Sequence, residues 1–555
     1  MSAQEEIKKA VEVSLKRFKL KEVDFLVEKP KEASHGDYST NVALVVSKQV
    51  KKNPMEVARQ IAQGMEGKIF KDVQVVAPGF INIFLKDEVF NKDIQQILKQ
   101  EDFGENKNLK NKKIIVEYTD PNPFKEFHIG HLMSNAIGES ISRILEFEEA
   151  KIVRVNYQGN VGLHVAKAVW GKKKNENLSW GEAYVFGSQS YEKDEDAKKE
   201  IISTNTDLYD PKIRETDKYY VSGFKETLAA FEKVYDKLGT KFNDNFFESE
   251  VADFGKKIVE EGLKKGIFET GEKGAIIFKG ESVGLHTRVF INSEGLPTYE
   301  AKELALAKVK YDKYKYDQSI VITGNEVDEY FKVLLAAMSQ IFPELAKKTM
   351  HIGHGMMRLP EGKMSSRTGK IVTAEFLIGK VQEVVLEKIK EREFSEAEKN
   401  EIAKKVAVGA LKYSILKQSI GSNIAYDLER SINFQGDSGP YLQYSLARAI
   451  SVLEKAKTEG IKELLKKAPE TVSTFVKMMQ YFPEVVQKAG KEYQPHYIAT
   501  YLTELAHEFN NYYAQNKIVD SKDELSPYKV AITKAFTVIM KNGLWLLGIP
   551  VLERM

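Results

Sequence analysis

Two copies of the tetrapeptide HIGH account for four of the nine histidines in the chain. In the first copy, His128 and His131 stand between a strand-like run at 114–119 and a helix-like run at 134–150. The free N–H groups and the dipole of a helix N-terminus form a natural anion site. Gly130 has no side chain, so a phosphate can approach the backbone there. We predict that both histidines donate hydrogen bonds to a nucleoside triphosphate whose α-phosphate is under attack.

The second copy, at 351–354, is not followed by a helix-like segment. Met350, Ile352 and Met356 share an alternating face, and Pro360 ends the run, so the pattern predicts a strand. Because no helix terminus reinforces these histidines, we interpret the second copy as a chance repeat of the first.

A basic loop rich in Gly and Ser, EGKMSSRTGK, follows this strand at 361–370. Lys363 is a point charge that can follow a phosphate, and Ser365 and Ser366 add hydroxyl donors. A lone KxSS sequence is more often an ordinary polar loop. Its pairing with the first HIGH copy is far more specific, and together they favour a nucleoside triphosphate site.

The elements around the first copy predict a Rossmann-like, doubly wound parallel sheet. The strand at 114–119, the helix at 134–150 and the strand at 151–159 form a βαβ unit. A further buried strand is expected at 317–324. The polar stretch at 171–222 is interpreted as an insertion on the surface of this fold.

The segments on either side predict further domains, which makes the chain a multidomain α/β protein. Residues 1–110 alternate helical and strand patterns, as an N-terminal α+β domain would, and 111–375 form the expected catalytic domain. We interpret 376–400 as a connecting stem and 401–555 as an all-α helical bundle. The last helix is expected to stop near Gly543.

Composition excludes several classes of protein. The chain has 555 residues and no cysteine, which excludes disulfides, thiolate nucleophiles and Cys-ligated zinc. Its 83 basic and 80 acidic residues give a net charge of +3, so any nucleic-acid contact must be local. The N-terminus lacks the pattern of a signal peptide, and no apolar run reaches the length of a membrane span. A cytoplasmic location is expected.

Several longer blocks resemble class I aminoacyl-tRNA synthetases, and specifically the arginyl-tRNA synthetase family. HGDYSTNVA at 35–43 and APGFINIFL at 77–85 resemble the extra N-terminal domain of that family. GDSGPYLQYSLARAISVL at 436–453 resembles the start of its anticodon-binding domain, and LLGIPVLERM its C-terminus. The resemblance covers essentially the whole chain.

The resemblance implies that arginine attacks the α-phosphate of ATP, which carries Mg²⁺, to give arginyl-adenylate, and that the arginyl group then passes to the terminal adenosine of tRNA(Arg). It also implies that tRNA binds before arginine is activated, and that no zinc is needed. The implied catalytic residues are His128, His131, Lys125, Lys363 and Ser366. The implied ATP-binding residues are His128, Gly130, His131, Lys363, Met364, Ser365 and Ser366.

For arginine, the resemblance implies contacts from Glu117, Asn122, Tyr299, Glu303 and Glu326. Glu303 stands where the family commonly has Asp, so the pocket must accommodate one more methylene. Two further departures weaken specific assignments. Asn160 replaces a carboxylate in GNVG at 159–162. Val327 and Tyr330 stand about where the family has Gln and His.

For tRNA, the expected contacts are Tyr441, Gln443, Tyr444, Arg448, Tyr38 and Asn41. Aromatic and guanidinium groups can stack on unpaired anticodon bases, although part of the 441–448 block must instead pack between helices. The expected partners are tRNA(Arg), arginine and ATP, with no DNA or membrane, and the family suggests a monomer. A class I synthetase for lysine or glutamine and a non-catalytic tRNA-binding paralogue remain open as alternatives.

Overall fold

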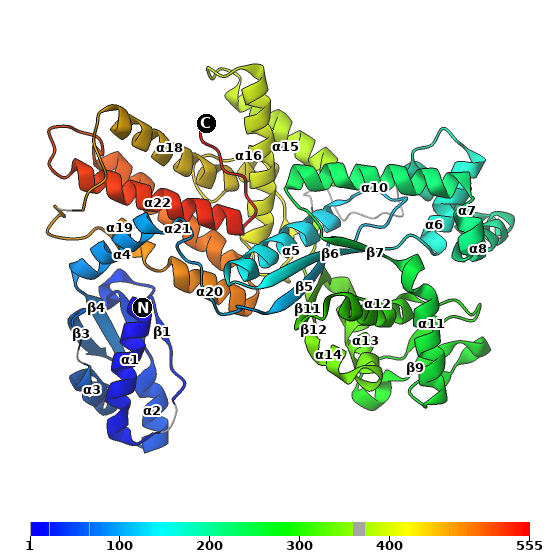
Figure 1. Cartoon of the computed structure of the whole chain (residues 1–555), viewed down its shortest axis with the longest axis horizontal. Helices are drawn as coiled ribbons and strands as arrows, with labels where there is room; N and C mark the ends of the chain where they lie inside the picture. Colours follow the sequence, from blue (N-terminus) through cyan, green and yellow to red (C-terminus); the bar gives the residue numbers. More distant parts are fainter. Residues whose placement is uncertain (1, 21–22, 66, 359–371, 466, 555) are drawn as a thin grey trace. The chain divides into compact units, whose positions relative to one another are not determined.

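The computed structural model describes residues 2–20, 23–65, 67–358, 372–465 and 467–554. The chain forms two compact units. One comprises residues 1–103, 448–484 and 504–540, and the other comprises 104–447, 485–503 and 541–555. Figure 1 gives the course of the chain.

The larger unit is built on a parallel sheet, as the sequence predicts, and the strand order in this sheet is β12-β11-β5-β6-β7. Its strands are β5 (Lys113–Tyr118), β6 (Lys151–Gln158), β7 (Asp244–Phe247), β11 (Gln318–Gly324) and β12 (Thr349–His354). Residues 114–118 of β5 are all buried, which is typical of a strand covered on both faces.

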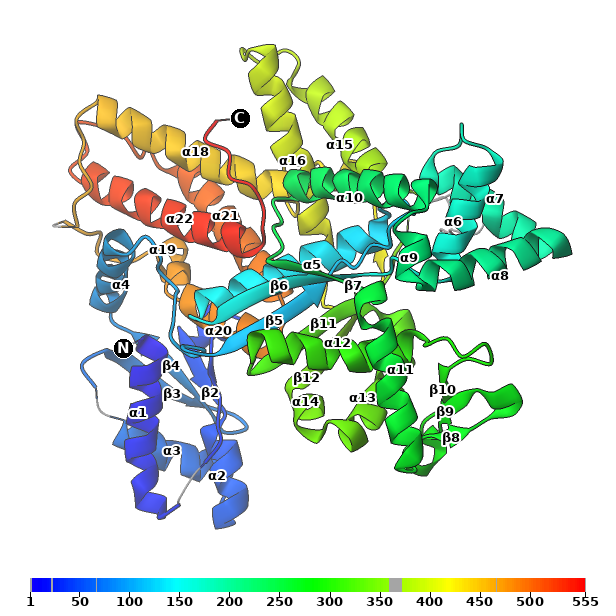
Figure 2. The same ribbon diagram turned by 45° about the vertical axis from the view of Figure 1, so that its right-hand side comes forward.

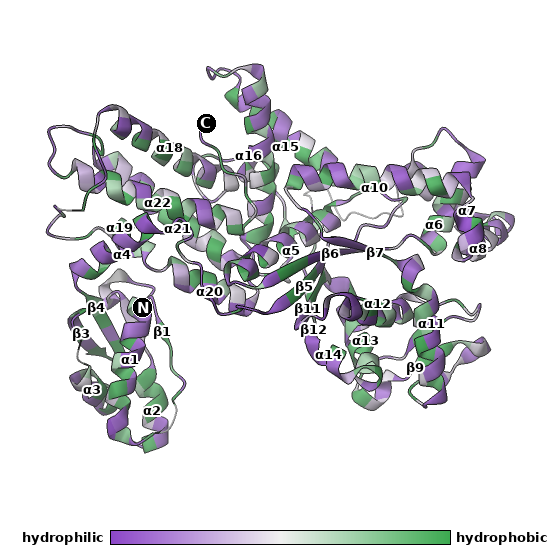
Figure 3. Cartoon of the chain, in the orientation of Figure 1, coloured by the Kyte–Doolittle hydropathy of each residue, from purple (hydrophilic) through white to green (hydrophobic). Residues whose placement is uncertain are grey.

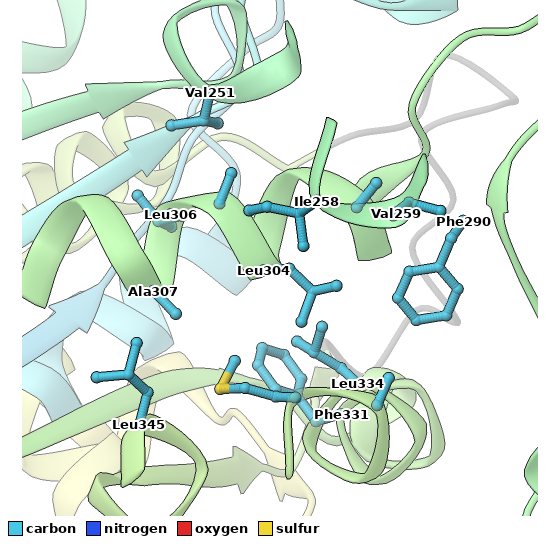
Figure 4. Packing of buried hydrophobic residues seen from close by; sticks show 14 of the residues in the cluster. Val251, Ile258, Val259, Phe290, Leu304, Leu306, Ala307, Phe331, Leu334 and Leu345 are labelled. Carbon is cyan, nitrogen blue, oxygen red and sulfur yellow. The ribbon is translucent and has the colours of Figure 1, made fainter. Parts of the chain in front are cut away.

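Helices cover both faces of this sheet. Helix α5 (Ile129–Phe147) lies on one face, and α11 (Glu248–Lys264), α12 (Tyr299–Tyr314) and α13 (Asp328–Ile341) lie on the other (Figure 2). Ile258, Leu304 and Leu334 interdigitate in the core on the second face (Figure 4). From β5 the chain winds first towards β6 and later returns to β11 on the other side. A doubly wound sheet binds ligands outside the carboxyl ends of its strands at such a reversal.

The polar stretch at 171–222 folds into helices with a core of their own. This region contains α6 (Leu163–Lys174), α7 (Trp180–Lys193), α8 (Glu195–Tyr209), α9 (Pro211–Arg214) and α10 (Lys218–Leu238). Ser179, Asp194, Asp210 and Asp217 accept hydrogen bonds from backbone N–H groups at the starts of α7 to α10. The buried side chains include Phe124, Val169, Trp180 and Ile201.

An antiparallel sheet with the order β10-β9-β8 lies between α11 and α12 along the chain. Its strands are β8 (Glu269–Thr270), β9 (Ile276–Phe278) and β10 (Arg288–Ile291). Helix α14 (Pro343–Lys348) leads into β12, and the short strand β13 (Met357–Arg358) that follows β12 pairs with β14 (Ile424–Ala425).

The N-terminal region has the α+β character that the sequence predicts. Its helices are α1 (Ala3–Leu15), α2 (Val42–Val50), α3 (Pro54–Gly64) and α4 (Asp87–Lys99), and its antiparallel sheet has the order β1-β2-β4-β3. The strands are β1 (Val27–Glu28), β2 (Tyr38–Thr40), β3 (Phe70–Val76) and β4 (Phe80–Leu85). Helix α1 buries Ile7, Val11 and Leu15 and exposes polar residues, which explains its mixed colouring in Figure 3.

The C-terminal part is helical, as predicted. It contains α15 (Ala374–Ile389), α16 (Glu396–Leu416), α17 (Leu428–Ser431), α18 (Gly439–Thr458), α19 (Thr474–Met479), α20 (Phe482–Glu492), α21 (His496–Gln515) and α22 (Ser526–Leu546). Helix α22 continues through Gly543 and ends at Leu546, three residues beyond the glycine near which it was expected to stop. A Cβ at Gly543 would lie 2.5 Å from Leu502 Cδ2, so this glycine permits close packing. None of the described helices has the length and apolar character of a membrane span.

Candidate active site

A cavity of about 670 Å³ opens where the carboxyl ends of β5, β11 and β12 meet. Asp120 follows β5, Gly324 ends β11 and His354 ends β12, and all three line the cavity. His128 and Gly130 at the start of α5 form a further part of its wall. Its volume is typical of a small-molecule site.

The first HIGH copy forms the N-terminus of α5. His128 is the N-cap, and its Nδ1 accepts hydrogen bonds from the backbone N–H of Gly130 at 3.1 Å and of His131 at 3.4 Å. His131 Nδ1 accepts from the backbone N–H of His128 at 3.3 Å. Because both Nδ1 atoms accept, each neutral ring carries its proton on Nε2. The rings stack 3.6 Å apart, so they present two Nε2–H donors side by side.

Burial keeps these two rings neutral. It lowers the pKa of His128 to about 4, with a further contribution from the charge of Lys125. Burial also lowers the pKa of His131 well below its usual value, and His128 and Lys125 add to this effect. At neutral pH both side chains are therefore uncharged donors, and α5 supplies the positive end of its dipole behind them.

Gly130 is required for this arrangement, because a Cβ there would lie 2.9 Å from His128 Cε1. The backbone N–H of Ile129 donates to the carbonyl of Val372 at 3.3 Å, and His128 bridges to Thr373. The chain therefore returns to the HIGH copy directly after the KMSS loop. Lys363, Met364, Ser365 and Ser366 themselves lie outside the described residues.

Another part of the cavity wall is acidic. Burial, together with the charge of Glu117, raises the pKa of Glu303 to about 8 and the pKa of Asp120 well above its usual value. Glu117 is ion-paired with buried Lys310 at 2.6 Å, and Glu300 lies 3.5 Å from Arg288. No described residue forms an ion pair with Asp120 or Glu303, so this wall is suited to a cationic ligand.

Backbone strain accompanies the placement of Asp120. Thr119, Asp120 and Phe124 have positive φ angles of 83°, 46° and 68° in the connection between β5 and α5. Asp120 Oδ1 accepts from the backbone N–H of Tyr157 at 2.8 Å, and its own N–H donates to Asn156 Oδ1 at 3.1 Å. Such conformations persist where the surroundings enforce them, often at functional sites.

All the residues expected to contact arginine line this cavity: Glu117, Asn122, Tyr299, Glu303 and Glu326. Asn122 Oδ1 accepts from the backbone N–H of Gly159 at 3.1 Å, which orients its amide. The ring of Tyr299 is approached by the ammonium group of Lys302 at 4.7 Å. Their roles towards a substrate stay predictions.

The second HIGH copy forms β12, as predicted, but its interpretation as a chance repeat is too narrow. His351 lies behind the cavity, where it stacks on Phe331 at 3.8 Å and forms a hydrogen bond with Thr323 Oγ1 at 2.8 Å. His354, three residues further on, lines the same cavity as His128. Strands β5 and β12 belong to the same parallel sheet, with β11 between them, so their carboxyl ends lie at the same edge and residues of both copies line one cavity.

The chain matches three family descriptions: "tRNA synthetases class I (R), catalytic domain" over residues 93–428, "DALR anticodon binding domain" over 442–555, and "Arginyl tRNA synthetase N terminal domain" over 4–85. The first alone spans more than half of the chain. The chain belongs to the class I arginyl-tRNA synthetases.

Curated relatives agree with this assignment, and solved structures share the fold. The chain is 31% identical over 566 residues to the arginine–tRNA ligase of Treponema denticola, covering 95% of this chain and 94% of that protein. It is 30% identical over 573 residues to that of Borreliella burgdorferi, covering 97% and 96%. The fold is similar to arginyl-tRNA synthetase from Thermus thermophilus, with a TM-score of 0.81, 21% identity and 100% coverage of both chains. It is also similar to the structure of arginyl-tRNA synthetase from Plasmodium falciparum, with a TM-score of 0.79 and 20% identity, covering 100% of this chain and 99% of that chain.

Lys125, which the family resemblance places at the phosphates, lines an adjoining pocket of about 320 Å³ together with both histidines of the first HIGH copy. Its ammonium group lies 4.6 Å from the centroid of the Tyr184 ring. The departure at Asn160 has a structural explanation. Its side chain bonds the Tyr220 hydroxyl at 3.1 Å and Ser249 at 2.9 and 3.0 Å, so it anchors α10 and α11.

In α18, part of the block expected to contact tRNA packs inside the protein. Gln443 is fully buried, and its amide donates to the carbonyls of Lys405 and Pro550 at 3.1 and 2.8 Å. Tyr441 is buried too, while Tyr444 is half-buried. The expectation that Gln443 contacts tRNA is therefore wrong, because its side chain is not accessible at the surface. Gln443 instead holds α18 against neighbouring segments of the protein.

Three other expected tRNA contacts lie in the smaller unit. Tyr38 is fully buried, and its hydroxyl donates to Glu484 Oε1 at 2.6 Å, so the expectation that it faces tRNA is wrong. Asn41 Oδ1 accepts from the backbone N–H of Leu26 at 2.9 Å, which positions the segment before β1. Arg448 is half-buried, donates to Asn510 and covers the ring of Tyr513 at 5.1 Å.

Asp120 and His354 are two of the cavity residues that the sequence analysis did not assign to the site. Asp120 stands in the turn-forming run TDPNP, where an aspartate is usually explained by the turn itself. A usable signal was nevertheless present, since Asp120 directly follows a buried parallel strand. For His354 the signal was similar, because His354 is the last residue of β12, another strand of the parallel sheet.

Proposed function

We propose that this chain is an arginine–tRNA ligase: arginine reacts with MgATP to give arginyl-adenylate and pyrophosphate, and the arginyl group then passes to the terminal adenosine of tRNA(Arg). The observation that carries this proposal is a cavity lined both by two carboxyl groups that form no ion pair with a described residue and by two neutral Nε2–H donors on a helix N-terminus.

Asp120 and Glu303 are proposed to bind the guanidinium group. A guanidinium group donates along fixed parallel directions and stays charged, so it suits a pair of carboxylates better than a lysine ammonium group does. Its charge would draw both groups into their ionised forms and lower their raised pKa values. Lys302 is already bonded to Glu248, and Lys310 to Glu117, so those carboxylates are compensated within the protein.

His128 and His131 are proposed to act on the α-phosphate. As the carboxylate of arginine attacks phosphorus, a P–O bond forms, the bond to pyrophosphate breaks and negative charge builds up on the non-bridging oxygens. Two fixed Nε2–H donors at a helix N-terminus stabilise this charge without reorganisation. The family resemblance assigns the departing pyrophosphate to Lys363 and Ser366, and we carry that over as part of the proposal.

In the second step, a hydroxyl group of the terminal ribose attacks the arginyl carbonyl, and AMP leaves. Residues 442–555, which match the DALR description, are proposed to bind the anticodon region of tRNA(Arg). Tyr444 and Arg448 remain as candidate contacts, since neither is fully buried. We further propose that the chain acts as a cytoplasmic monomer.

The test is the exchange of labelled pyrophosphate into ATP with and without tRNA(Arg), for each candidate amino acid. Arginine alone should support exchange, and tRNA should be needed. In Asp120→Asn and Glu303→Gln, the KM for arginine should rise about 100-fold or more, while the KM for ATP changes little. Exchange that depends on lysine or glutamine would exclude the proposal.

A further inference from the structure

His354 presents the opposite hydrogen-bonding group to the histidines of the first HIGH copy. Its Nδ1 lies 2.7 Å from the carbonyl oxygen of Gly355, and a carbonyl can only accept, so Nδ1 carries the proton. Nε2 is therefore an acceptor. No described residue donates to it, although only 4% of the residue is exposed and it lines the cavity. Where His128 and His131 offer two N–H donors, His354 offers a lone pair.

The charged groups around His354 differ from those around Glu303, although Glu326, one of the residues expected to contact arginine, is among them. The carboxylates that act on the His354 ring are Glu326 and Asp328. Those that act on Glu303 are Glu117 and Glu248. Burial lowers the pKa of His354, so Nε2 stays unprotonated at neutral pH. The surroundings of His354 and of Glu303 therefore differ in the chemistry that they present.

Apolar side chains line the cavity near His354. Met133 of α5 lies beside His354 and Gly355 in a small adjoining recess, which fixes their proximity. Ile129, Met356 and Met357 line the main cavity as well. With the guanidinium group at the acidic wall and the phosphates at the N-terminus of α5, this apolar region is left for the purine base. Thioether and aliphatic side chains pack well against the face of such a ring.

We propose that His354 Nε2 accepts a hydrogen bond from the exocyclic amino group of adenine and so selects ATP among purine nucleotides. This rests on the proposed function, which supplies ATP as the substrate. A base with a 6-oxo group would bring a second acceptor against the lone pair of Nε2. A base with hydrogen at position 6 would leave Nε2 unbonded in a largely buried position, and a site built to bond an N–H group discriminates strongly against an analogue that lacks it.

The experiment compares ATP with purine riboside 5′-triphosphate, which lacks only the 6-amino group, in arginine- and tRNA-dependent pyrophosphate exchange. The unmodified protein should prefer ATP about 10-fold or more in kcat/KM. In His354→Phe this preference should fall to about 2-fold or less, mainly through a higher KM for ATP. In His354→Gln it should persist, because the amide oxygen can take the place of the Nε2 acceptor.

His351→Gln is the matched control, since His351 belongs to the same tetrapeptide but lies behind the cavity. Whatever its effect on absolute rates, the ratio between the two nucleotides should be unchanged. Because the comparison of the two nucleotides on the unmodified protein needs no variant, the proposal stays testable if His354→Phe does not fold.

Three outcomes would overturn the assignment. The unmodified protein could use both nucleotides equally well, or His354→Phe could retain the full preference for ATP. Finally, His354→Phe could lose a preference for ATP over 2′-deoxyATP while it keeps the preference for ATP over purine riboside triphosphate. That result would place Nε2 at the ribose. Failure of the proposed function is distinguishable from all three, because no nucleotide would then support arginine-dependent exchange.

Discussion

Arginine binding should release a proton from the acidic wall of the cavity. Burial and the charge of Glu117 raise the pKa of Glu303 to about 8 before arginine binds. The guanidinium group binds the ionised carboxylate and stays charged throughout the neutral range. Only about 1% of Glu303 is ionised at pH 6 and about half at pH 8, so the affinity for arginine should increase about 50-fold between them. The pKa of Asp120 is raised in the same direction, and the two groups titrate as a pair.

The assay is isothermal titration calorimetry of arginine binding at pH 7 in buffers of different ionisation enthalpy. At pH 7 Glu303 alone should release about 0.9 proton for each arginine bound, Asp120 should add to this release, and Glu303→Gln should release clearly less than the unmodified protein. The histidines at the phosphate site do not interfere, because the pKa of His128 is lowered to about 4. Binding without proton release, together with an affinity that is flat from pH 6 to pH 8, would refute this assignment of the acidic wall.

The same raised pKa fixes the sign of a stability effect. A carboxyl group whose pKa is higher in the folded protein than in the unfolded chain contributes stability below about pH 4.5, and this contribution is lost as the pH rises through the folded value of about 8. A tenfold difference in proton affinity between the folded and unfolded states corresponds to about 1.4 kcal/mol. At pH 8.5 without arginine, Glu303→Gln should therefore unfold at a higher temperature than the unmodified protein. A lower Tm would contradict the electrostatic account.

Three further substitutions test separate parts of the structure. His131→Ala removes one Nε2–H donor and should reduce adenylate formation about 100-fold in single-turnover assays while leaving tRNA affinity unchanged; an unchanged rate would exclude the role. Gly130→Ala places a Cβ 2.9 Å from His128 Cε1 and should lower kcat/KM for ATP about 10-fold or more, with Gly379→Ala in open space as a neutral control. Lys310→Met leaves Glu117 charged and buried without its partner, and should reduce the free energy of unfolding by about 3–5 kcal/mol in urea titrations. A loss below about 1 kcal/mol would mean that the pair is not buried as described.

Local sequence patterns were sufficient to predict the phosphate side of the site. The buried run at 114–118 predicts β5, and the HIGH copy between this strand and α5 places His128 and His131 at a helix N-terminus. These are neighbours in sequence, so periodicity and helix-capping chemistry determine their arrangement. The tautomer of the two rings could not be predicted, because it depends on which backbone N–H groups each Nδ1 meets.

Long-range placement is what the sequence did not provide. His354 reaches the cavity because β12 lies next to β11 in the sheet. The residues of β12 do not indicate which strand will pair with it. Tyr38 and Gln443 are polar enough for a surface contact, yet tertiary packing encloses both. The helices within 171–222 were not predicted for a different reason, which is that apolar residues are sparse in this polar run. Ser179 and Asp194 are nevertheless N-cap residues that indicate where two of these helices begin.

The most direct measurement is a tRNA(Arg) charging assay with each of the twenty amino acids, supplied singly with MgATP. The account predicts efficient charging with arginine only, because the carboxyl groups of Asp120 and Glu303 are proposed to bind a guanidinium group in the cavity that also holds the phosphate site. Efficient charging with lysine or glutamine and none with arginine would contradict it.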